Sequence, residues 1–131
     1  MKITVTVRDQ SSTGRQAGVC ELEDIPSAIT VRELIRTRVR EEVARYNAGP
    51  SNIFAGLVMP EGAEPARGGF ALPTRRRVDW RNQADRAVSA FSTNAFFVLI
   101  DDRQATELDE ELDLTPDSDI CFVRLVQLVG G

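Results

Sequence analysis

The sequence predicts one domain of the α+β class, with a sheet that carries its helices on one face. Three observations lead to this prediction. Apolar side chains alternate with a period of two over residues 2–8, recur near every 3.6 residues over 31–43, and form a short continuous run over 95–100. These patterns are typical of a half-buried strand, an amphipathic helix and a buried strand.

The chain has 131 residues, 42% of them hydrophobic, which is enough for one packed core. Its 16 basic and 20 acidic residues give a net charge of −4, so we expect protein partners, with no nucleic acid and no membrane. No apolar stretch approaches the ~20 residues that span a bilayer, and Met1-Lys2 leads directly into a strand pattern. A cytoplasmic protein is therefore expected.

Histidine is absent, which removes the commonest general base and the commonest zinc ligand. The two cysteines, Cys20 and Cys121, have no metal-ligand spacing. We therefore predict no catalytic residue, no metal site and no cofactor, and a protein that is not an enzyme.

The first half of the chain predicts a hairpin followed by a helix. Residues 2–8 and 17–23 alternate like strands around a polar, glycine-containing loop. Thr30 and Glu33 have the spacing of a capping box at a helix start. The predicted helix buries one stripe of five apolar side chains and ends before Gly49-Pro50. These five are Val31, Leu34, Ile35, Val39 and Val43.

An insertion is predicted over about 49–93. Five glycines and four prolines interrupt every periodic pattern between Gly49 and Pro73, which is typical of a loop, partly ordered by the apolar cluster within 53–59. A second helix is predicted over 78–91. The segment over 49–77 is either a recognition surface or a tolerated surface loop, and the sequence leaves both interpretations open.

The last third predicts the remaining strands. Residues 95–100 are expected to form a central buried strand, 103–108 a short edge strand, and 109–114 a turn with Leu112 or Leu114 inward. Residues 119–128 form the last predicted strand.

Five segments together resemble the ubiquitin-like modifier family. They are M-K-I-T-V-T-V, P-S-A-I-T-V-R-E-L-I, F-F-V-L-I-D-D-R-Q, L-D-E-E-L-D-L-T-P-D-S-D-I and F-V-R-L-V-Q-L-V-G-G. The resemblance covers 1–47 and 95–131 and fails across the insertion. It is strongest to bacterial ubiquitin-like proteins encoded with activating, conjugating and deconjugating enzymes. It implies a β-grasp fold, a mixed sheet covered by the main helix, here with an inserted loop and second helix.

The resemblance also implies a function for the predicted flexible tail over 127–131. In this family an activating enzyme uses ATP to adenylate the terminal carboxylate, here that of Gly131, which then passes as a thioester to a conjugating enzyme and on to amines of target proteins. A deconjugating protease reverses the link. Gly130 gives clearance because it lacks Cβ, and Gln127, Leu128 and Val129 form the stem that the enzymes recognise.

Two other functions remain open. The same diglycine serves sulfur carriers, which use a C-terminal thiocarboxylate, and a non-covalent β-grasp interaction module needs no tail chemistry. Lys2, the only lysine, is a candidate acceptor for linkage of the protein to itself.

The strand order implied by the resemblance places Cys20 and Cys121 about 9 to 10 Å apart, beyond disulfide reach, so two reduced thiols are expected. On the last strand, Val123 and Leu125 are expected to point inward. Phe122 and Val126 are then candidate partner contacts, with a core position for Phe122 as the alternative.

Two charged segments are expected to be solvated and not to form sites. Arg75-Arg76-Arg77 has no aromatic interleaving and no glycine-rich phosphate loop beside it. The acidic residues within 107–113 match no calcium-binding loop.

Overall fold

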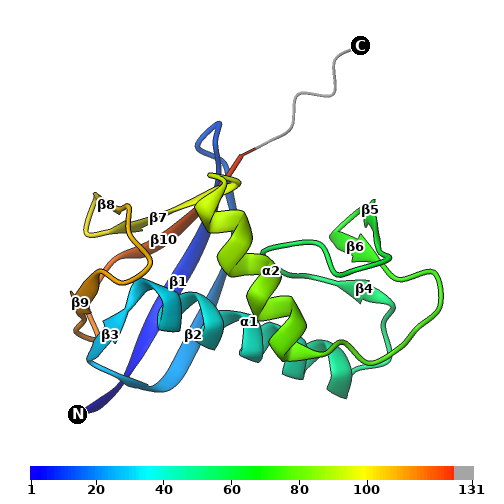
Figure 1. The fold of residues 1–131 in the computed structure, drawn as a ribbon, viewed down its shortest axis with the longest axis horizontal. Helices are drawn as coiled ribbons and strands as arrows, with labels where there is room; N and C mark the ends of the chain where they lie inside the picture. The colour runs from blue at the N-terminus through cyan, green and yellow to red at the C-terminus, as the bar shows by residue number, and fades with distance from the viewer. Residues whose placement is uncertain (126–131) are drawn as a thin grey trace. The chain divides into compact units, whose positions relative to one another are not determined.

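The computed structural model describes residues 1–125 of the chain. It is a mixed α+β structure with two helices (Figure 1). By its contacts the chain divides into two compact units. Unit 1 consists of Met1–Arg32 together with the chain from Phe91 onward, and unit 2 is Glu33–Ala90.

Unit 1 contains a five-stranded mixed sheet in the order β2-β1-β10-β7-β8. The strands are β1 (Lys2–Ser11), β2 (Gln16–Pro26), β7 (Phe96–Ile100), β8 (Arg103–Ala105) and β10 (Ile120–Arg124). The first and last strands, β1 and β10, run side by side in parallel, and the other neighbours are antiparallel (Figure 1). The predicted hairpin and the strand predicted over 95–100 are confirmed. The predicted edge strand over 103–108 ends at Ala105, and the last strand, predicted over 119–128, is found as Ile120–Arg124, with residues 126–128 outside the described part of the chain.

The register of the strands places buried side chains together on one face of this sheet. Val7 pairs with Ile120, which pairs with Ile100, and all three side chains are buried. Two residues further along β10 the same face carries Phe122, whose ring lies 6.0 Å from that of Phe96. Alternation along each strand places the core side chains on this face.

A second, two-stranded sheet in unit 1 was not predicted. It pairs β3 (Ala28–Thr30) with β9 (Glu111–Asp113), and Ile29 lies opposite Leu112. Both Leu112 and Leu114 are buried, so the turn that was expected to send one leucine inward buries two.

Helix α1 (Val31–Ala48) begins directly after Thr30, as predicted. The amides of Val31 and Arg32 donate to the carbonyls of Glu110 and Leu108, at 3.1 and 2.9 Å. These bonds satisfy two of the backbone donors that a helix start leaves unpaired. All five apolar side chains of the predicted stripe are buried.

The insertion in unit 2 forms a small three-stranded sheet, in the order β4-β6-β5. Its strands are β4 (Ile53–Phe54), β5 (Glu64–Ala66) and β6 (Gly69–Ala71). Phe54 is fully buried, with the Tyr46 ring edge-on at 5.6 Å. The predicted loop is therefore ordered in part by Phe54, which packs against Tyr46 of α1.

Side chains bind backbone groups on both borders of the insertion. The Asn47 amide bonds to both the N–H and the carbonyl of Val78, at 2.9 and 3.0 Å, and Gln83 donates to the Val58 carbonyl at 2.7 Å. Arg75 donates to the carbonyls of Tyr46 and Ser51, both at 3.1 Å. The insertion is thus attached to the end of α1 and to the second helix.

Helix α2 (Trp80–Ser92) begins two residues later than predicted. Val78 is bound by Asn47, and the Asp79 carboxylate accepts a hydrogen bond from the Arg81 amide at 3.0 Å. Asp79 is therefore the N-cap, which places the first helical residue at Trp80. Neither helix, within residues 1–125, has the length and hydropathy of a membrane span.

Candidate functional site

The end of β10 is the point from which the predicted functional tail begins. Arg124 is the last residue of this strand, and its guanidinium pairs with Asp9 of β1 at 3.2 Å. The Leu125 amide donates to the Ala95 carbonyl at 3.4 Å. Because β10 runs parallel to β1, it ends beside the β1–β2 loop, away from Met1 (Figure 1).

The tail residues themselves lie outside the described part of the chain. This applies to the conjugation residues Gly130 and Gly131 and to the stem residues Gln127, Leu128 and Val129. The structure describes the strand that precedes them. This strand is central, with β1 on one side and β7 on the other, and Ile120 and Phe122 within it are fully buried.

The expected partner contact at Phe122 is wrong. Phe122 is 0% exposed, whereas Leu125, which was expected to be buried, is 45% exposed. The register explains this result, because Phe122 lies opposite Val98 of β7 on the face that carries the core. Val126, the second expected contact, lies outside the described residues.

The opposite face of the sheet carries a different apolar group. Val123 lies opposite Phe97, and Leu99 is two residues along on the same side of β7. All three side chains are half-buried. Val19 of β2, which pairs with Arg8, is 58% exposed. This face therefore exposes apolar side chains to solvent, whereas Phe122 exposes none of its surface.

Arg8 and Asp119 form a two-point charged contact at the start of β10. Arg8 Nε and Nη2 donate to the two Asp119 carboxylate oxygens at 2.8 and 3.0 Å. This hydrogen bonding lowers the pKa of Asp119 and holds the pKa of the Arg8 guanidinium above its usual range. The pair fixes β1 to the start of β10.

Neither cysteine forms a disulfide within residues 1–125, as expected. Cys20 pairs with Val7 and Cys121 with Arg8, so adjacent β1 positions place them on opposite faces of the sheet. Burial raises the pKa of the Cys121 thiol, which keeps it protonated and a poor nucleophile.

Lys2 is exposed at the start of β1. Its amine is therefore accessible, and its role as an acceptor for self-linkage stays a prediction.

Two side chains of the acidic turn within 107–113 form ion pairs. Asp109 pairs with Arg32 at 3.3 Å and Glu110 with Arg103 at 2.6 Å. Within residues 1–125 no group of three or more acidic or cysteine side chains is arranged to hold a metal ion.

One cluster in unit 2 was not predicted. The guanidinium carbons of Arg36, Arg40 and Arg81 lie 5.3, 5.3 and 5.2 Å from the centre of the Trp80 ring. The i, i+4 spacing of Arg36 and Arg40 places them on one side of α1. Nothing in the local sequence indicates that Trp80, some forty residues later, lies against them.

Comparison of the chain with protein-family models, curated proteins and solved structures gave no match.

Proposed function

We propose that the chain is a ubiquitin-like protein modifier with a β-grasp fold. In this proposal an activating enzyme joins the carboxylate of Gly131 to the AMP part of ATP, with release of pyrophosphate. A thiol of the enzyme displaces AMP to form a thioester, and the acyl group then passes to a thiol of a conjugating enzyme. An amine of a target protein displaces that thiol to form an amide, which a protease later hydrolyses.

The observation that carries the proposal is the position of β10. This strand is central, is parallel to β1, and leads in the sequence to the residues that end in Gly130-Gly131. The sheet has β1 between β2 and β10, which supports the β-grasp part of the proposal, since the resemblance implies a first strand that lies between the second and the last. Because β10 is hydrogen-bonded to β1 and to β7, the residues that lead to the diglycine follow a strand that is held on both sides.

The division of chemistry between this chain and its enzymes supports the same interpretation. A carboxylate is a poor electrophile at neutral pH, and an activating enzyme supplies the adenylate. The modifier supplies a thin terminus, and a pair of glycines without Cβ gives the closest backbone approach. Nothing in this role requires a nucleophile or a general base in the modifier, which is consistent with the absence of histidine and with the buried thiol of Cys121.

The test is an activation assay with a cognate activating enzyme and a cognate conjugating enzyme. Protein ending at Gly131 is incubated with the activating enzyme, ATP and magnesium, and the products are resolved with and without reductant. We expect a reductant-sensitive thioester, followed by ladders on target proteins once the conjugating enzyme is added. A variant lacking Gly130 and Gly131 should form neither product.

Two outcomes would overturn the proposal. A thiocarboxylate detected by mass spectrometry, without conjugates, would identify a sulfur carrier. Equal biological activity of the tail-deleted variant would identify a non-covalent module. A Lys2→Arg variant separates the self-linkage prediction from the main one, because it should remove only side-chain-linked products between copies of this protein.

A further inference from the structure

The two units of the chain carry opposite charge. Unit 2 has ten arginines and seven acidic residues, a formal net charge of +3, whereas the rest of the chain has six basic and thirteen acidic residues, a net charge of −7. The positive charge is therefore concentrated in the unit that contains the insertion.

Within unit 2 the Trp80 cluster holds three guanidinium groups close together. Each lies within 5.3 Å of the centre of the indole ring, so no two are more than roughly 10.6 Å apart, which is close to the Debye length of ~8 Å at physiological ionic strength. Their mutual repulsion is only partly screened. An anion bound among them would relieve it.

The acidic side chains nearest in sequence to this cluster are already engaged. Arg36 is paired with Glu33 at 3.4 Å and with Asp85 at 3.8 Å. Glu41 pairs with Arg45 at 3.3 Å, and Asp79 caps α2.

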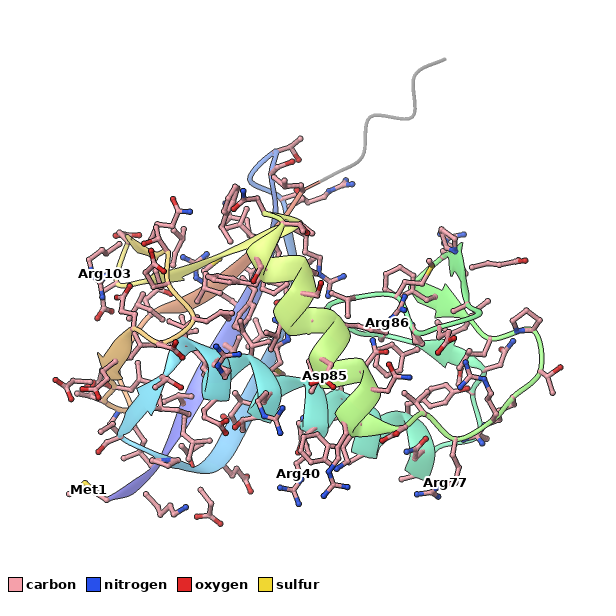
Figure 2. All side chains as sticks on the ribbon, viewed as in Figure 1. Met1, Arg40, Arg77, Asp85, Arg86 and Arg103 are labelled. Carbon is pink, nitrogen blue, oxygen red and sulfur yellow. The ribbon has the colours of Figure 1, made fainter. Side chains whose placement is uncertain are left out.

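Two charges of the cluster remain without an acidic partner within residues 1–125. These are the exposed guanidinium groups of Arg40 and Arg81, and Arg40 extends away from the ribbon (Figure 2). Because these two guanidinium groups lack an acidic partner there, they favour a negatively charged ligand.

We propose that the surface formed by Trp80, Arg36, Arg40 and Arg81 binds an acidic peptide segment of a partner protein. Arginine forms two-point hydrogen bonds with carboxylates. Tryptophan and arginine together are the residues most enriched among those that dominate protein–protein binding energy. A nucleic acid fits less well, because the chain as a whole is negative, at −4, and repels an extended polyanion. This surface does not involve the tail.

Trp80 is the only tryptophan of the chain, so its fluorescence reports directly on this surface. The probe is a short synthetic peptide that alternates glutamate and serine, and the control is a glutamine–serine peptide of equal length. We expect the glutamate peptide to change Trp80 emission saturably, with an affinity that falls as salt is raised. The control peptide should produce no saturable change.

Matched variants test the assignment. Calorimetry on the Arg40→Ala/Arg81→Ala double variant should show a Kd weaker by about tenfold or more. Arg67→Ala should bind like the original protein, since Arg67 is exposed in the same unit but belongs to no ion pair or ring contact there. Both replaced side chains are exposed, and circular dichroism is used to check that each variant is folded.

Three results would overturn the proposal. They are unchanged affinity in the double variant, equal binding of the glutamine peptide, and saturable binding of a single-stranded oligonucleotide in preference to the glutamate peptide. Deletion of Gly130 and Gly131 should leave peptide binding unchanged. The outcome is therefore independent of the modifier proposal.

Discussion

Arg8 and Asp119 are 111 positions apart in the sequence and meet through two hydrogen bonds, at 2.8 and 3.0 Å. Arg8 also donates to the Gln10 side chain at 3.0 Å. The pair therefore joins the middle of β1 to the residue before β10, where the last strand enters the sheet. It lies on the open side of the sheet, and both side chains are partly exposed.

Replacing Asp119 with asparagine should lower the free energy of unfolding by about 1 kcal/mol at neutral pH, because a two-point pair is stronger than a simple surface pair but is still partly solvated. The pKa of Asp119 is lowered in the folded protein. Its stabilising contribution is therefore present above the ordinary value of 3.8 and is lost as the pH falls through the folded pKa. Denaturant melts over a pH series measure this effect.

The matched control for that prediction is Asp117→Asn. Asp117 is exposed, and of its groups only the backbone N–H forms a hydrogen bond within residues 1–125. The two variants should differ at neutral pH and converge in acid. A constant difference at all pH values would show that the Asp119 carboxylate does not act through its charge.

Phe122→Ala should be one of the most damaging substitutions in unit 1. Removing a fully buried phenylalanine costs about 3–5 kcal/mol, a large share of the stability of a small protein. Val19→Ala, on the exposed part of β2, should change stability by less than about 0.5 kcal/mol. Thermal melts of the two variants compare these effects, and similar melting temperatures would contradict the buried position of Phe122.

Most of the regular structure was predictable because each long element contains a full periodic pattern. The period of two over 2–8 and the helical stripe over 31–43 each mark several side chains that the structure buries. Strands of two or three residues, such as Ile53–Phe54 and Ala28–Thr30, are too short to show a period. Their pairing depends on distant residues.

The error at Phe122 has a specific cause. The residues from Ile120 to Val123 are all apolar, so alternation does not reveal which set faces the core, and a shift by one residue exchanges the two sets. Pairing with the fully buried Val98 of β7 places Phe122 on the core face, and this pairing is not visible in the local sequence. The Trp80 cluster was also missed, because its contacts join residues that lie far apart in the sequence.

The two thiols should differ in reactivity. Cys121 is buried and its pKa is raised by burial, whereas Cys20 is only half-buried. Because the thiolate is the reactive form, iodoacetamide should modify Cys20 first and Cys121 about tenfold or more slowly, through local opening. Peptide mass spectrometry gives both rates, and a Cys20→Ser variant should show no fast phase.

Gly69→Ala tests whether the insertion is a packed structure. Gly69 has a φ of +151°, and a Cβ there would lie 2.4 Å from the Phe54 carbonyl oxygen. Both the backbone strain and the clash oppose a side chain, so the free energy of unfolding should fall by about 2 kcal/mol or more. Amides of β4 and β6 should also exchange faster with solvent.

Gly18→Ala is the control for Gly69→Ala, because Gly18 lies in β2 and a Cβ there meets nothing within 4 Å. Its stability should stay within about 0.5 kcal/mol of the original protein. If both variants were equally stable, Gly69 would not need to approach Phe54 closely. Of the two interpretations of 49–77 that the sequence leaves open, the tolerated surface loop would then be favoured over a packed recognition surface.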